Sequence, residues 1–123
     1  SSLLGVMSQR LVRLLCPACR EPADANSAEC EQLGLEASAE PVVIHHAVGC
    51  EKCKYSGFRG RTGIYEMIDI DDEMRTMIYE GASEQEILSV ARGRYPGIES
   101  DGRRRILAGE PSLKEVLRVT AIA

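Results

Sequence analysis

Two Cys-x-x-Cys pairs are the residues of this chain best suited to chemistry. Cys16 and Cys19 form the first pair, Cys50 and Cys53 form the second, and thirty residues separate the two. Each pair places two sulfur atoms on one tight turn, so the two pairs together provide the four ligands of a tetrahedral zinc site. Four thiolates leave no coordination position open for water. The pattern therefore predicts a structural Zn²⁺ rather than a catalytic one.

Other roles for the cysteines and their neighbours were weighed against this prediction. A redox-active pair is typical of a βαβ unit, whereas Cys16 follows an expected helix. Disulfides are typical of oxidising compartments, and the sequence has no recognisable secretory signal. His45 or His46 could replace one cysteine in a Cys₃His site. Cys30 is left over as a fifth thiol and is expected to be a small, partly buried residue.

Size and composition narrow the classes of function. The chain has 123 residues with one Phe and no Trp, so its core is thin and a bound metal would help to stabilise it. Its net charge of −4 argues against nucleic-acid binding. No apolar run approaches the ~20 residues that cross a bilayer, so no transmembrane segment is expected. The sequence contains no P-loop and no Ser/His/Asp or Cys/His arrangement, so we predict no catalytic residues.

The spacing of apolar residues predicts the elements that hold the cysteines. Apolar residues recur at helical intervals before the first pair, which predicts a helix over residues 3–15. A short helix capped by Asn26 and Glu29 should follow, and the segments 42–48 and 64–70 are typical of strands. Helices are then expected from Asp71, Ser83, Ile98 and Ser112. In the first two of these we expect the following residues to face inward: Met74, Met77, Ile78, Ile87, Leu88 and Ala91.

These elements predict an α+β fold that is mostly helical. We expect a small four-cysteine zinc subdomain with a short β-hairpin over residues 16–70, followed by a helical bundle over residues 71–123. Residues 1–15 would form a separate terminal helix, whose wide apolar stripe needs a partner. The chain begins at Ser1 rather than Met, so we expect it to be part of a longer protein.

Several short motifs occur in a specific order along the chain. They are residues 4–13 (Leu-Gly-Val-Met-Ser-Gln-Arg-Leu-Val-Arg), the two cysteine pairs, residues 57–66 (Gly-Phe-Arg-Gly-Arg-Thr-Gly-Ile-Tyr-Glu), 107–110 (Leu-Ala-Gly-Glu) and 115–120 (Glu-Val-Leu-Arg-Val-Thr). Taken together, they resemble the C-terminal end of the type II secretion ATPase family (general secretion pathway protein E). The resemblance covers nearly the whole chain.

The resemblance implies a function for the longer protein. Members of that family are cytoplasmic traffic ATPases, peripheral to the bacterial inner membrane, whose hexameric ring is thought to power pseudopilus assembly and protein export. The cysteines that match Cys16, Cys19, Cys50 and Cys53 bind zinc there. Residues 1–15 would be the last helix of the ATPase core, and the sites for ATP and Mg²⁺ would lie upstream. This part alone is therefore expected not to hydrolyse ATP.

The implied partners are the upstream ATPase core, neighbouring subunits of the hexamer and the inner-membrane secretion platform proteins, with no nucleic acid. Type IV pilus assembly ATPases carry a similar four-cysteine insert and are the close alternative, although residues 115–120 favour secretion. A stand-alone zinc-ribbon binding module is the alternative from another class. The acidic charge balance and the single Phe argue against that module.

Overall fold

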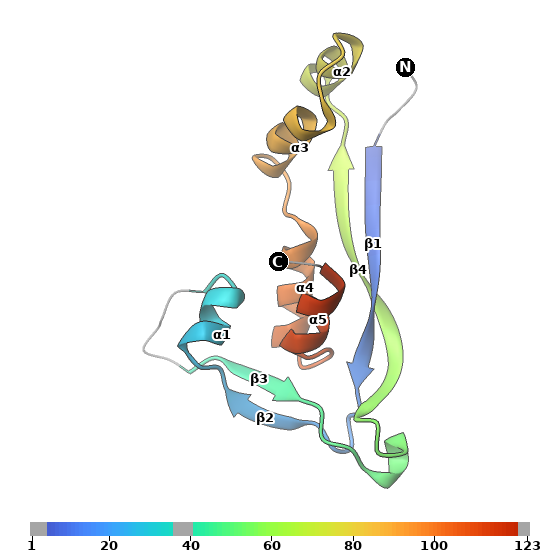
Figure 1. Cartoon of the computed structure of the whole chain (residues 1–123), viewed down its shortest axis with the longest axis vertical. Coiled ribbons are helices and arrows are strands. Elements are labelled where there is room, and N and C mark those ends of the chain that lie inside the picture. The colour runs from blue at the N-terminus through green and yellow to red at the C-terminus, as the bar shows by residue number, and fades with distance from the viewer. Residues whose placement is uncertain (1–4, 36–40, 121–123) are drawn as a thin grey trace.

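The computed structural model describes residues 5–35 and 41–120 (Figure 1). Within them, two separate two-stranded antiparallel sheets form. Strand β1 (Gly5–Leu15) pairs with β4 (Phe58–Asp69) in a long ribbon, which has a register shift between Arg13 and Leu15. Strand β2 (Glu21–Asp24) pairs with β3 (Val43–His46) in a short one. The strand predicted over residues 42–48 is thus confirmed as β3, and the one predicted over 64–70 lies almost wholly within β4.

Helices occupy the rest of the described chain. Helix α1 (Ser27–Gln32) lies between β2 and β3, and its predicted capping box of Asn26 and Glu29 is present. Four helices follow β4, in this order: α2 (Asp72–Tyr79), α3 (Glu84–Arg92), α4 (Ile98–Leu107) and α5 (Leu113–Thr120). Helices α4 and α5 lie along the β1–β4 ribbon, whereas α2 and α3 lie at the end where β4 finishes (Figure 1). The α+β fold is confirmed.

The helix predicted over residues 3–15 was wrong. Residues 5–15 form strand β1, while Leu3 and Leu4 lie outside the described residues. Met7 and Leu11, on the supposed apolar stripe, are 61% and 55% exposed. Pairing with the whole length of β4 outweighs the local helical pattern, since strand formation depends on the partner more than on intrinsic preference. Residues 5–15 therefore do not form the predicted terminal helix, and the division at residues 15 and 70 stays a prediction.

Two hydrophobic clusters of unequal size hold the fold together. The main cluster joins buried residues from β1, β3, β4, α4 and α5 and from the end of α1: Val12, Leu33, Ile44, Ile64, Ile98, Ile106, Leu113 and Val116. The second cluster packs α2 and α3 on the end of β4 and comprises Ile68, Ile70, Met74 and Ala91. Met74 and Ala91 are buried as predicted. Ile78 and Leu88 were also expected to face inward, but they are 36% and 37% exposed.

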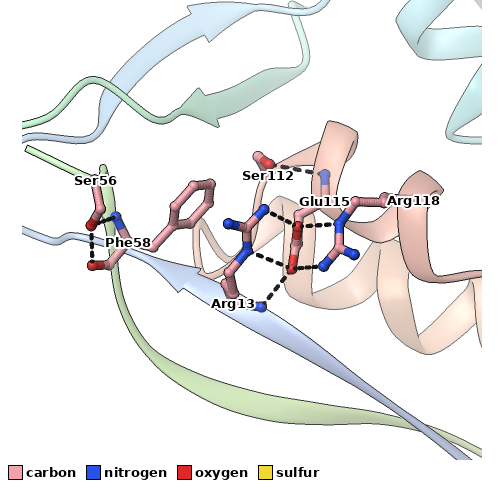
Figure 2. Close-up of polar contacts among 6 residues, drawn as sticks. All are labelled: Arg13, Ser56, Phe58, Ser112, Glu115 and Arg118. Atoms are coloured by element: carbon pink, nitrogen blue, oxygen red, sulfur yellow. Dashed lines mark hydrogen bonds and ion pairs between the residues drawn. The ribbon is translucent and has the colours of Figure 1, made fainter.

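A buried carboxylate ties α5 to β1 (Figure 2). Glu115, whose side chain is 2% exposed, accepts a hydrogen bond from the backbone N–H of Arg13 at 2.9 Å. The guanidinium groups of Arg13 and Arg118 also donate to it, at 2.8 to 3.1 Å. Burial alone would raise the pKa of Glu115, but these hydrogen bonds outweigh burial and lower the pKa to about 2. The carboxylate therefore holds the end of β1 against α5, three residues before the first cysteine.

We expect Glu115→Gln to lower the free energy of unfolding at pH 7 by about 3 kcal/mol, because two arginines lose their buried anionic partner. Because folding lowers the pKa of this carboxyl group, its ionised form stabilises the fold fully at pH values above its ordinary pKa of 4.5. This stabilisation is lost as the pH falls toward 2. Urea titrations between pH 7 and pH 3 should show this loss in the wild type and not in the variant.

The matched control is Glu110→Gln. Glu110 pairs with Arg105 but is 43% exposed, so its loss should cost less than about 1 kcal/mol. Equal costs for the two variants, or the same pH dependence in Glu115→Gln as in the wild type, would contradict a stabilising role for the buried carboxylate.

A second prediction concerns Gly102, where α4 packs closely on α5. An added Cβ would lie 2.7 Å from Cγ1 of Val116, a buried and conformationally stiff side chain. Although alanine favours a helix over glycine by ~1 kcal/mol, we expect Gly102→Ala to destabilise the protein by about 1–3 kcal/mol. Urea denaturation of Gly102→Ala, Val116→Ala and the double variant should show partial recovery in the double variant.

Gly93→Ala serves as its control, because an added Cβ there meets nothing closer than 3.5 Å. Its effect should stay within about 0.5 kcal/mol. A Gly102→Ala variant as stable as the wild type would show that α4 and α5 can separate without cost.

Candidate metal centre

The two cysteine turns lie at one corner of the molecule because of the strand order. Cys16–Cys19 connects β1 to β2, and Cys50–Cys53 connects β3 to β4 and contains the short 3₁₀ helix η1 (Glu51–Cys53). Since β1 pairs with β4 and β2 with β3, both turns pass from one sheet to the other at the same point (Figure 1). Two backbone hydrogen bonds hold the start of the first turn. Leu15 N–H donates to Glu110 O at 2.8 Å, and Cys16 N–H donates to Gly57 O at 2.9 Å.

The four sulfur atoms have the spacing of a tetrahedral site. All four Sγ atoms lie within 4.8 Å of one another. The Cys16–Cys50, Cys19–Cys53 and Cys50–Cys53 sulfurs are each 3.8 Å apart. A regular tetrahedron with Zn–S bonds of ~2.3 Å has edges of ~3.8 Å. The ~2.05 Å of a disulfide is far shorter, and the cysteines are free thiols. The cluster therefore has the geometry to hold one metal ion.

Backbone N–H groups point at two of the sulfurs. Gly49 N–H donates to Cys19 Sγ at 3.4 Å, while Cys50 and Gly57 N–H both donate to Cys53 Sγ at 3.2 Å. Gly57 has a φ of +83°, and an added Cβ would lie 2.8 Å from the Cβ of Ala47. A side chain would thus disturb this turn. The sequence analysis missed these donors, although a glycine directly before Cys50 and another four residues after Cys53 were visible signals.

The N–H donors lower the pKa of both thiols, but the net shifts are opposite because burial outweighs the donor at Cys19 and not at Cys53. Burial alone would raise the pKa of Cys53, but the N–H groups of Cys50 and Gly57 outweigh it and lower the pKa to about 6. Burial raises the pKa of Cys19 to about 12, against the opposing hydrogen bond from Gly49. Four adjacent thiols cannot all ionise without a cation, because each negative charge disfavours the next. A divalent cation would take the place of the protons.

The remaining candidates from the sequence lie outside this cluster. Among the described residues, the potential metal-binding group contains the four cysteines and neither His45 nor His46, so the geometry favours Cys₄ over Cys₃His. Cys30 is on α1, with its Sγ 3.9 Å from the carbonyl oxygen of Ala25. Arg20, the residue after Cys19, donates a hydrogen bond to the carbonyl of Gly109.

The redox interpretation is not favoured by the observed topology either. The first turn follows a strand rather than the predicted helix, but the next element is strand β2. The sheet it leaves is antiparallel, so the βαβ setting of a redox pair is missing from this corner. No helix within the described residues has both the length and the apolar character needed to cross a membrane.

Comparison with known proteins gives the family. A family model described as "Type II/IV secretion system protein" matches residues 1–118. Type II secretion system protein E of Pseudomonas aeruginosa is 53% identical and that of Dickeya dadantii 48%, while type II secretion system ATPase E of Vibrio cholerae is 45% identical. Each alignment covers 98% of this chain but 24% of the relative. The chain thus spans about a quarter of the length of these relatives. Because the family model covers almost all of it, the chain belongs to the type II/IV secretion system protein family, which confirms the resemblance drawn from its motifs.

Proposed function

We propose that this chain is the C-terminal, zinc-stabilised part of an ATPase that powers pseudopilus assembly and protein export through the type II secretion system. Its own role is structural and interactional. The observation that carries the proposal is the four-cysteine cluster at the corner between the two sheets. Relatives named for type II secretion over 98% of the chain favour secretion rather than pilus assembly.

The proposed ligands are Cys16, Cys19, Cys50 and Cys53, and the proposed ion is Zn²⁺. Four thiolates are the donor set that zinc prefers in structural sites. The ion would supply cohesion and no reaction, since all its positions are taken. The N–H groups of Gly49 and Gly57 orient two of the sulfurs and offset part of their negative charge. Zinc would thus lock β1 and β4 to the β2–β3 sheet.

Catalysis is proposed to lie elsewhere in the longer protein. The present sequence has no P-loop, and the curated relatives are about four times as long as the aligned region. ATP and Mg²⁺ would bind in that remainder. We further propose a cytoplasmic location at the bacterial inner membrane, with neighbouring subunits of a hexamer and the membrane platform of the secretion system as partners. The ATPase named among the relatives supports the proposal that the longer protein hydrolyses ATP.

The metal proposal predicts about one equivalent of zinc in the purified chain. Cys16→Ser and Cys53→Ser should each lose the metal and disorder the corner between the sheets, because structural zinc contributes an apparent ~10–16 kcal/mol in small peptides. Metal analysis, together with thermal unfolding before and after a strong chelator, measures both effects. Substitution with Co²⁺ reports the geometry through its thiolate absorption bands.

Cys30→Ser is the matched control, because its thiol lies outside the cluster. It should keep the metal content and the melting temperature of the wild type. Less than half an equivalent of zinc, combined with a stability that the chelator does not change, would contradict the proposed structural zinc site.

If catalysis lies in the rest of the longer protein, the purified 123-residue chain should hydrolyse no ATP above background, whereas the full-length protein should hydrolyse it. A coupled phosphate-release assay at matched concentrations measures both. Full-length Cys53→Ser should lose much of its activity if the corner supports the motor, while full-length Cys30→Ser should keep it. ATP hydrolysis by the chain alone would contradict the assignment of catalysis to the remainder.

A further inference from the structure

An apolar groove lies at the opposite end of the ribbon from the cysteines. This is the end where β1 begins and where β4 leads into α2 and α3 (Figure 1). Its cavity volume is about 340 Å³. The lining includes side chains from all four elements: Val6, Ile68, Met74, Ile78, Glu84 and Leu88. Glu84 is the one charged residue among the lining side chains.

Three of the apolar side chains that line the groove are partly exposed. Val6, Ile78 and Leu88 are 44%, 36% and 37% exposed. Ile78 and Leu88 are also two of the six residues in these helices that were predicted to face inward. Within the described residues, α2 and α3 pack on each other and on the end of β4 around four buried residues, which leaves these two side chains partly exposed. Apolar side chains gathered in one groove are typical of a binding surface.

The shape and lining favour side chains of another protein over a small molecule. A volume of about 340 Å³ is at the low end of the ~300–1,000 Å³ of ligand pockets. Such pockets also need several converging polar groups, and this one offers a single carboxylate at its rim. A row of apolar side chains at helical spacing would fill a groove lined by α2 and α3.

The segment that carries α2 and α3 is acidic, and this charge favours a basic helix. Residues 69–94 contain seven carboxylates and three arginines, so this segment alone carries a net charge equal to the −4 of the whole chain. Arg94 pairs with Asp71 and Glu73, and Arg75 pairs with Asp72. Four carboxylates of this segment have no basic side chain within ion-pair distance among the described residues. They are Asp69, Glu80, Glu84 and Glu86. An acidic surface of this kind attracts and orients a basic partner.

We propose that this groove docks a basic amphipathic helix of a partner protein. Apolar residues on one face of the helix would occupy the groove beside Ile78 and Leu88, and flanking lysines or arginines would lie near Glu84 within this acidic segment. The inference rests on the groove and its charge, and it depends neither on the metal nor on the secretion function.

The test uses the purified 123-residue chain and two fluorescent 18-residue peptides. Both peptides carry the same leucine face at helical spacing, but one has lysines on its flanks and the other has glutamates. Fluorescence anisotropy should show the lysine peptide binding about tenfold more tightly than the glutamate peptide or better, a difference that shrinks as salt rises. Amide chemical shifts should change in α2 and α3. Absence of binding, or equal affinity for both peptides, would overturn the proposal.

Two variants distinguish peptide binding in the groove from non-specific binding to other parts of the surface. Leu88→Glu should weaken the lysine peptide by about tenfold or more, and Glu84→Lys should weaken it while strengthening the glutamate peptide. Both side chains are already solvent-accessible, so the urea midpoint should stay close to that of the wild type. Leu107→Glu is the matched control, since Leu107 is 43% exposed on α4 and does not line the groove. An equal loss in this control would refute the site.

Two other occupants would overturn the proposal if found. Nuclear Overhauser contacts between Leu3 or Leu4 and the Ile78 side chain would assign the groove to the chain's own N-terminal residues. A concentration-dependent dimer that Leu88→Glu dissociates would assign it to a second copy of the chain. Light scattering and NMR on the peptide-free protein distinguish these cases from an open groove.

Discussion

The antiparallel pairing of β1 with β4 constrains where every other element can lie. The register runs from Gly5 opposite Asp69 to Leu15 opposite Phe58, so the segments that leave the two strands at this end start side by side. Cys16 directly follows β1, and four residues separate Cys53 from the start of β4. The short β2–β3 sheet closes the loop between them. The two cysteine pairs, which are thirty residues apart in the sequence, are thereby brought together. At the far end the same pairing places Val6 beside Ile68, where the groove begins.

Two different interactions hold the end of β1, one on each side of Leu15. Glu115 binds the backbone and the guanidinium of Arg13, and the cysteine cluster holds the chain from residue 16 onward. The Arg13 guanidinium also lies 4.1 Å from the centre of the Phe58 ring, so it links both strands of the ribbon to α5 (Figure 2). The carboxylate is nearly buried and satisfied by charged donors, whereas the thiols need a cation to be satisfied. The first tie is therefore complete in the protein alone, whereas the second would depend on the proposed metal ion.

Sequence reasoning succeeded where one residue type and its spacing determine the outcome. The paired cysteines, the caps at Asn26 and Asp71 and the strand at residues 43–46 depend on local chemistry, and each was found in the structure. It failed for β1, where Leu, Met and Val recur at intervals that suit a helix, because the decisive partner lies some fifty residues away in β4. The N–H donors to sulfur and the ion pairs of Glu115 depend on the same long-range arrangement. Ile78 and Leu88 were assigned correctly to the apolar sides of their helices, but periodicity cannot say whether anything covers such a side.

The two ends of the ribbon differ in how strongly they are held. At the cysteine end, the main cluster joins eight buried residues from β1, β3, β4, α4, α5 and the end of α1, and a metal ion held by the four thiols would add a further tie. At the other end, four buried residues hold α2 and α3, and the chain returns to α4 through a short connection that contains Pro96. A region with so few buried contacts opens more readily than the rest of a domain. A partner that fills the groove would add buried surface where the fold is weakest, so its binding energy would stabilise α2 and α3 rather than the cysteine corner. Metal binding and partner binding would then act on separate parts of the structure, and each could vary without the other.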